Sequence, residues 1–190
     1  MGKTALVLLD LQVGILALSG LDQTKLSEFL GRASAAARAA RAAQHPVIYV
    51  TVSFRAGHPE IAASNATFAR AKAAGGFVIG DPSVAVHPDV APQEGDVSVV
   101  KRRVSAFGGS DFDAVLRGLG VDTLVLGGVA TSGAVLSTVR QAADLDFKIT
   151  VLEDLCLDMD EEVHKVLVQK VFPRQATVVS SEEWIKEVSK

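Results

Sequence analysis

The chain has little of several features that mark particular classes of protein. Its 190 residues include one cysteine, Cys156, so neither an intrachain disulfide nor a cysteine-based metal cage can form. No apolar run reaches the length of a membrane span, and the stretch after Met1 is ended by Asp10, too early for a secretion signal. Basic residues are spread along a chain of net charge −3 and offer no concentrated positive field. We therefore expect a cytoplasmic protein that binds neither nucleic acid nor a membrane.

Length and composition predict one globular domain covering residues 1–190. Hydrophobic residues make up 48% of the chain and charged residues 22%, without any biased tract or internal repeat. A chain of this length can bury one sizeable core, whereas two complete domains would be cramped.

Six short runs rich in leucine and β-branched residues alternate with longer segments rich in alanine and charge. Several of these runs are apolar throughout, as in a parallel sheet that is covered on both faces. We expect strands at residues 4–9, 47–52, 97–100, 123–126, 148–152 and 177–179. We expect helices at residues 22–43, 110–119, 135–145, 160–171 and 181–188. This order predicts an α/β fold of three layers, a six-stranded, mainly parallel sheet with helices on both faces.

The segment from residue 56 to residue 92 differs from the rest of the chain. Glycine, proline and small residues surround one short helical stretch near residues 62–73. Loops above strand ends commonly build ligand pockets. We expect this segment to cross the sheet and to help form a substrate pocket, although a simple surface connection is the alternative.

Two charged residues stand where predicted strands end. Asp10 follows the first strand and Lys101 follows the third. Open α/β sheets bind their ligands at the carboxyl ends of the strands, and a buried carboxylate can act there as a general acid or base. The alternatives are a helix cap for Asp10, and for Lys101 a solvated basic turn shared with Arg102 and Arg103.

The fourth strand runs into a turn of glycine and small residues, which then enters a helix at about Val135. Free amide groups at a helix start can bind an anion or stabilise an oxyanion. The glycines of residues 127–133 follow the fourth strand rather than the first, and they lack the G-x-G-x-x-G spacing of a dinucleotide loop. We therefore expect no nucleotide cofactor, and a small molecule as the partner.

Together these three segments resemble the isochorismatase-like hydrolases, also called the cysteine hydrolase superfamily, from about residue 5 to residue 179. The family pattern has a strand-end Asp-x-Gln, matched by Asp10 and Gln12, and a strand-end Lys, matched by Lys101. Its third part is a Gly-Val-x-Thr-x-x-Cys-Val turn. Residues 128–135 read Gly-Val-Ala-Thr-Ser-Gly-Ala-Val, so Ala134 stands at the position of the family's nucleophilic cysteine.

The resemblance implies a six-stranded parallel sheet and a homo-oligomer. It also implies a cis peptide bond between Val129 and Ala130, as in many family members. Because a methyl group cannot be a nucleophile, amide hydrolysis through a thioester is excluded for the chain as it stands. The resemblance then implies an isochorismatase-type reaction, in which Asp10 and Lys101 hydrolyse the enol ether of isochorismate or a similar small carboxylate and release pyruvate.

Two alternatives remain open at this point. The chain could be a cysteine amidohydrolase whose nucleophile is replaced by Ala134, by nature or by design, or a relative that binds a ligand without catalysis. Cys156 lies between leucines and is expected to pack as a small hydrophobic side chain.

Further residues near the strand ends are candidates for the substrate pocket. They are Gln12, Phe54, Arg55, His58, Phe107, Val129, Ala130 and Gly133. Nicotinamidase relatives bind a metal through an Asp and nearby histidines. No second histidine lies close to His58 in the sequence, so we predict no metal.

Overall fold

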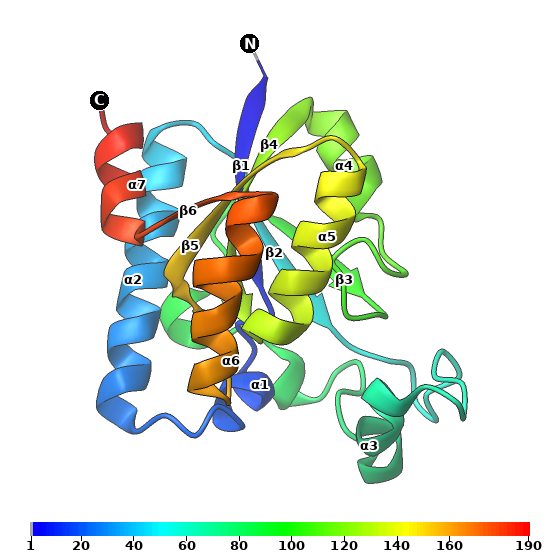
Figure 1. The fold of residues 1–190 in the computed structure, drawn as a ribbon. Coiled ribbons are helices and arrows are strands. Elements are labelled where there is room, and N and C mark those ends of the chain that lie inside the picture. The colour runs from blue at the N-terminus through cyan, green and yellow to red at the C-terminus, as the bar shows by residue number, and fades with distance from the viewer. Residues whose placement is uncertain (1) are drawn as a thin grey trace.

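The computed structural model describes residues 2–190 and contains one sheet of six parallel strands (Figure 1). Across the sheet the strands are β3 (Val97–Lys101), β2 (Val47–Val52), β1 (Lys3–Leu9), β4 (Val121–Val129), β5 (Lys148–Leu157) and β6 (Thr177–Val179). The predicted α/β fold class is therefore confirmed. The strand order reverses direction between β1 and β4, because β2 and β3 extend the sheet to one side and β5 and β6 to the other.

Helices cover both faces of the sheet. Helices α2 (Gln23–Ala42) and α7 (Ser181–Val188) lie side by side on one face, and α4 (Phe112–Leu119), α5 (Leu136–Asp144) and α6 (Glu161–Val166) cover the other (Figure 1). Alternate residues of β1 enter the two cores: Leu6 and Leu8 pack on the side of α2, and Val7 and Leu9 on the opposite side. Burial on both faces explains why this strand is apolar throughout.

Helix α2 shows how local sequence and packing agree. The Asp22 side chain accepts a hydrogen bond from Lys25 N at 2.9 Å, which satisfies one of the free amide groups at the helix start. Its buried face carries mainly alanines, spaced three or four residues apart, which allow the helix to approach the sheet closely. The buried residues are Phe29, Leu30, Ala33, Ala36, Ala37 and Ala40.

Strand β4 is longer than the sequence pattern predicts. It runs on through Gly127 and Gly128 to Val129, because these residues pair with the neighbouring strands. Gly128 has φ +149°, and a Cβ added there would lie 2.2 Å from the carbonyl oxygen of Leu9. Only glycine lets β4 pass so close to the end of β1, the point from which Asp10 projects.

Strand β5 also extends beyond its predicted end at residue 152, to Leu157, and further differences lie in the helices. The helix expected from residue 135 is preceded by a π-helical turn, η3 (Thr131–Val135), and the helix expected at 160–171 divides into α6, a second π turn η4 (Leu167–Val171) and the 3₁₀ turn η5 (Phe172–Arg174). A helix α1 (Val13–Ala17) follows Asp10, as the alternative interpretation of Asp10 as a helix cap required, but the N-cap of this helix is Gln12.

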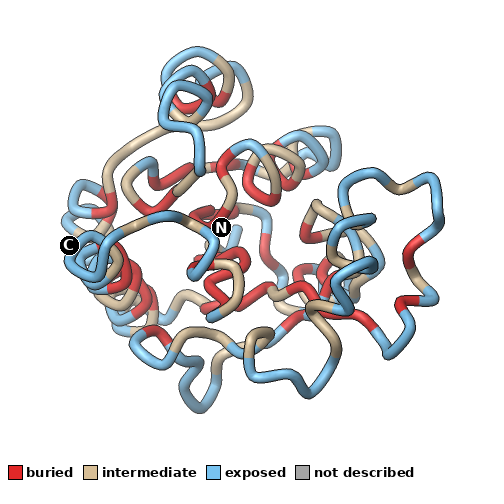
Figure 2. The backbone as a smooth tube through the Cα atoms, turned by 90° about the horizontal axis from the view of Figure 1, so that it is seen from below, coloured by how far each residue is buried: buried red, intermediate tan, exposed pale blue. Residues whose placement is uncertain are grey.

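The segment after β2 forms an excursion away from the sheet. It contains α3 (Ala66–Ala74) and the 3₁₀ turns η1 (Pro82–Val84) and η2 (Pro88–Val90). Seen from below, buried residues gather in the interior of the molecule and exposed residues surround them (Figure 2). Within residues 2–190, no helix combines the length and the apolar character needed to span a membrane.

Candidate active site

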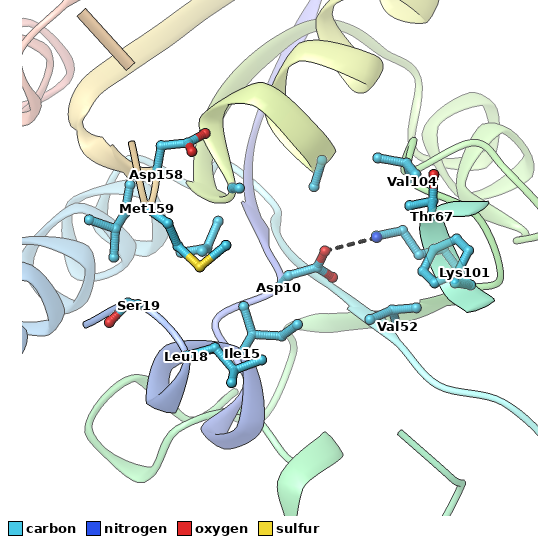
Figure 3. Close-up of a pocket in the computed structure, with 15 residues that line it drawn as sticks. Asp10, Ile15, Leu18, Ser19, Val52, Thr67, Lys101, Val104, Asp158 and Met159 are labelled. Carbon is cyan, nitrogen blue, oxygen red and sulfur yellow. Dashed lines mark ion pairs between the residues drawn. The ribbon is translucent and has the colours of Figure 1, made fainter. Parts of the chain in front are cut away.

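The carboxyl ends of β1, β3 and β4 surround a cavity at the point where the strand order reverses. Asp10 directly follows β1, Lys101 is the last residue of β3, and the turn η3 follows β4. Figure 3 shows the Asp10 carboxylate in the middle of this cavity, with the Lys101 side chain directed toward it. Ligands of open α/β sheets bind in this position.

Asp10 and Lys101 form a buried ion pair. Lys101 Nζ lies 2.8 Å from Asp10 Oδ2, and the two side chains are only 2% and 6% exposed, respectively. Lys101 Nζ also donates to the Arg103 carbonyl oxygen at 3.2 Å. The second carboxylate oxygen, Asp10 Oδ1, is buried and has no hydrogen-bond partner among the described residues. One oxygen is therefore held by the lysine, and the other is a buried acceptor without a partner among the described residues.

Burial raises the pKa of Asp10 above its ordinary value of 3.8, because the charged carboxylate loses its hydration. The charge of Lys101 and its hydrogen bond act in the opposite direction and lower the pKa. Burial is the larger effect. Asp10 is thus a carboxyl group whose proton is retained to higher pH, which suits proton transfer to or from a bound molecule.

The backbone of Asp10 has an unusual conformation. Its φ of +55° lies in the left-handed region, where aspartate is tolerated better than most residues. The Asp10 N–H donates to the Val50 carbonyl oxygen at 2.8 Å, which extends the pairing of β1 with β2 by one residue. The turn in the backbone begins at this residue, so its side chain is directed over the strand ends (Figure 3).

The turn η3 forms another wall of the cavity. The Val129–Ala130 peptide bond before it is cis, and Ala134 is 3% exposed and lines the cavity with its methyl group. Ser132 N–H donates to Asp158 Oδ2 at 2.7 Å, and Gly133 N–H donates to the Ala130 carbonyl at 3.1 Å. Val135 N–H donates to the same carbonyl. These three amides already have acceptors, so an oxyanion hole drawing on the whole turn is not formed.

The cavity measures about 210 Å³ and is mainly apolar. Its charged and polar lining consists of Asp10, Ser19, Thr67, Lys101 and Asp158. The apolar lining consists of Ile15, Leu18, Val52, Phe68, Val104, Val129, Ala130, Ala134, Leu157 and Met159. The space therefore suits a small molecule with an apolar body and few charges.

Several residues expected in the substrate pocket lie outside this lining. The Gln12 side chain is fully buried and bonds to the backbone of Val52 at 3.0 Å and 2.8 Å and to the Val84 carbonyl at 2.8 Å. It joins β1 to β2 and to the excursion rather than facing a ligand. Arg55 is exposed and pairs with Glu60 at 2.7 Å.

Aromatic packing and main-chain contacts account for the other expected pocket residues that do not line the cavity. His58 Nε2 lies 2.7 Å from the Gly76 carbonyl, and the ring packs near Phe54. Phe54 in turn contacts Phe68, at 5.2 Å between ring centroids, and so supports a residue that does line the cavity. Phe107 packs against Phe112 and Phe147 in the core, and Gly133 is outside the lining.

The remaining candidates for reactive chemistry lie apart from the Asp10 cavity. Cys156 is buried in β5, and burial raises its thiol pKa to about 12, which keeps it unreactive at neutral pH. In the described part of the chain, residues 2–190, no group of three or more His, Cys, Asp or Glu side chains is arranged to hold a metal ion.

Sequence reasoning missed much of the apolar wall. Ile15 lies in α1 and Leu18 caps the end of that helix, while Leu157 is the last residue of the unpredicted extension of β5 and Met159 follows it. Phe68 and the polar Thr67 belong to the excursion, in which His58 was the residue named as a pocket candidate. Proximity to a strand end was the available signal for the segment around Met159.

Comparison with known proteins agrees with the fold. The model of the isochorismatase domain matches residues 4–183, and the chain belongs to this family of hydrolases. It is 35% identical to the uncharacterized isochorismatase family protein YecD of Escherichia coli O157:H7 over 189 residues, covering 95% of this chain and 93% of the relative.

Two further relatives are amidohydrolases or cysteine hydrolases by description. Ureidoacrylate amidohydrolase RutB of Pseudomonas syringae pv. syringae is 34% identical over 171 residues, covering 80% of this chain and 70% of the relative. The crystal structure of a cysteine hydrolase from Pseudomonas syringae pv. phaseolicola superposes with a TM-score of 0.89 at 25% identity, covering 98% of this chain and 92% of the other.

Proposed function

We propose that this protein is a hydrolase of the isochorismatase type that needs no cysteine nucleophile. It cleaves the enol ether of isochorismate or of a similar small carboxylate and releases pyruvate. The observation that carries the proposal is the buried Asp10 carboxyl group in the cavity lining, which has one oxygen held by Lys101 and the other without a partner among the described residues. Ala134 provides only a methyl group in the same cavity.

In this reaction Asp10 is the general acid. Its proton passes to the terminal vinyl carbon of the enol ether and leaves an oxocarbenium ion. Water adds to that ion, and the resulting hemiketal breaks its bond to the alcohol oxygen, releasing pyruvate and the alcohol. The proton lost by the water restores Asp10. Lys101 holds the Asp10 carboxyl group in place and attracts the substrate carboxylate.

The charge balance of the cavity favours a substrate with one carboxylate. Among residues 2–190, Lys101 is the only basic side chain in the lining. When Asp10 carries its proton, it no longer neutralises Lys101, which can then pair with one anionic group, while the Asp158 carboxylate in the same lining opposes a second negative charge. A bound carboxylate would in turn raise the pKa of Asp10 further and keep the acid protonated. Isochorismate carries two carboxylates, so a smaller monoanionic enol ether fits this balance better.

The amidohydrolase relatives suggest a second reading of the same site. The cysteine of such an enzyme would correspond to Ala134, and without a thiol no thioester can form. A chain that only binds its ligand is the third possibility. The three alternatives predict different activities for the unmodified protein and for its Ala134→Cys variant.

An assay of pyruvate release distinguishes the three alternatives. The protein is incubated with isochorismate and with small enol ethers of pyruvate, and pyruvate is measured with lactate dehydrogenase. We expect turnover by the unmodified protein and a loss of about 10²-fold or more in Asp10→Asn, the usual range for a general acid. Asp89→Asn, a change at an exposed carboxylate, is the matched control and keeps full activity.

The pH dependence and the amide substrates complete the experiment. Activity should fall as pH rises through the pKa of Asp10, because an acid must be protonated, whereas a general base would give the opposite slope.

Ureidoacrylate hydrolysis that appears only in Ala134→Cys would identify a disabled amidohydrolase. No turnover by either form would favour a binding protein.

The resemblance further leads us to propose a homo-oligomer acting in the cytoplasm. Large apolar side chains at the mouth of the cavity support self-association, since Leu18 is 64% exposed and Met159 is 76% exposed. Light scattering on the purified protein tests the oligomeric state, and a monomeric mass would refute it.

A further inference from the structure

Two side chains from the segment after β5 hold the turn η3: Asp158, which lines the cavity, and His164, which lies outside the lining. Asp158 Oδ2 accepts the Ser132 N–H at 2.7 Å. His164 Nδ1, on α6, lies 2.9 Å from Thr131 Oγ1. The two contacts restrain consecutive residues of the turn that carries Ala134.

The contact between Thr131 and His164 has the character of a structural restraint. Thr131 is completely buried, and a buried hydroxyl needs a hydrogen-bond partner. The imidazole nitrogen can accept from the hydroxyl or donate to it, depending on the tautomer, so either arrangement preserves the bond. The two residues are 33 positions apart in the sequence, so the bond ties α6 to the turn.

His164 is itself placed by the start of α6. The Asp160 side chain caps this helix by accepting the Val163 N–H at 3.0 Å. The Asp160 N–H donates to Asp158 Oδ1 at 3.3 Å, while the other Asp158 oxygen holds Ser132. The segment from residue 158 to residue 164 therefore forms one hydrogen-bonded unit with the turn.

We propose that His164 is a positioning residue, which acts through Thr131 to hold residue 134 against Asp10 and Lys101. The inference rests on the proposed function only in taking η3 as a wall of the catalytic cavity. It deepens that proposal by naming a residue outside the cavity lining on which the geometry of the site depends.

A thiol introduced by Ala134→Cys reports on the turn without any substrate. The native Cys156 is buried with a pKa of about 12, so it contributes little background. The new thiol would share the cavity with Asp10, Lys101 and Asp158. Its ionisation depends on how closely the turn holds it to the positive charge of Lys101, with the two carboxylates acting in the opposite direction.

The measurement is the rate of alkylation by iodoacetamide as a function of pH, followed by intact mass. In the Ala134→Cys background, His164→Ala should slow alkylation at neutral pH by about threefold to tenfold, the range expected for one neutral hydrogen bond. The midpoint of the pH profile should move upward. His164→Asn places an amide near the position of Nδ1 and should restore most of the rate.

Combining changes at His164 and Thr131 distinguishes a positioning role from a general loss of structure in the turn. Thr131→Val should slow alkylation by a similar factor, and adding it to His164→Ala should produce little further change, because both remove the same bond. His45→Ala, next to the amino end of β2, is the matched control and should leave the rate unchanged. Circular dichroism and thermal unfolding show whether each variant is folded.

The proposal is overturned if His164→Ala leaves the rate and the midpoint unchanged, or if the effects of His164→Ala and Thr131→Val simply add. If His164→Ala does not fold, Thr131→Val with and without His164→Asn makes the same comparison. Absence of pyruvate release would refute the proposed reaction and leave this result intact, so the two failures are distinguishable.

Discussion

Lys101 Nζ lies 2.8 Å from Asp10 Oδ2, and both side chains are almost completely shielded from solvent. Burying two charges removes their hydration, and their mutual attraction commonly does no more than offset that loss. The pair therefore contributes little to stability by itself. Its position at the carboxyl ends of the strands, with one carboxylate oxygen left free, fits a role in chemistry.

The pH dependence of stability should reveal the raised pKa of Asp10. In the unfolded chain this group loses its proton near pH 3.8, whereas the folded state retains it to higher pH. The stabilisation is thus complete below the unfolded pKa and is lost as pH rises through the folded one. Asp10→Asn does not titrate, so its stability relative to wild type should increase over this window. Urea unfolding at several pH values measures the difference, and a flat difference contradicts the prediction.

Lys101→Met tests the other half of the pair. Removing the positive charge also removes the effect that lowers the Asp10 pKa, so the alkaline limb of the activity profile should move to higher pH. We expect kcat/KM to fall by about 10²-fold or more, since the lysine positions the acid. Lys186→Met on the surface of α7 is the control and should change neither activity nor stability appreciably. An unchanged profile in Lys101→Met would contradict the assignment.

Gln12→Leu should reduce stability rather than substrate affinity. The side chain bonds to three backbone groups of Val52 and Val84, and removing it leaves buried polar groups unpaired. At about 1–3 kcal/mol for each such group, the free energy of unfolding should fall by about 3 kcal/mol or more. Gln93→Leu, at an exposed position, is the control. A stable Gln12→Leu variant with a raised KM would instead make Gln12 a substrate ligand.

Cys156 should be inert. Its thiol is buried and its pKa is raised to about 12, so iodoacetamide should label the native protein far more slowly than a free cysteine at neutral pH. Cys156→Ala should keep the full rate of pyruvate release, with a stability loss of about 1 kcal/mol for the space it leaves. Loss of activity in this variant, with folding intact, would make the thiol part of the mechanism.

Chelation should leave pyruvate release unchanged. His58 is the metal ligand that the sequence suggested, but its Nε2 lies 2.7 Å from the Gly76 carbonyl oxygen and the residue is not part of the cavity lining. Asp10 is paired with Lys101 instead of facing a cluster of ligands. Exhaustive treatment with a chelator followed by assay tests this. Activity that is lost and then restored by zinc or iron would contradict it.

The expected positions of Asp10 and Lys101 follow from a simple geometric rule. Both residues end apolar runs, and parallel strands of one sheet have their carboxyl ends at the same edge, so the two side chains meet there. The pocket candidates Phe54, Arg55 and His58 also follow a strand, β2, but none of them lines the cavity. After a strand ends, the backbone turns, and local contacts such as those of Arg55 with Glu60 and His58 with Gly76 set the side-chain directions.

The sequence by itself determined the α/β class, the approximate strands and the strand-end charges, because apolar runs, helix formers and chain order act locally or through general rules of sheet topology. Tertiary structure alone decided which side chains enclose the cavity. Leu18 just after α1, Phe68 of α3 and Met159 after β5 are far apart in the chain, and only packing brings them together around Asp10. The same packing leaves Asp10 Oδ1 without a partner and joins His164 to Thr131, since both depend on how distant elements fill the space above the sheet.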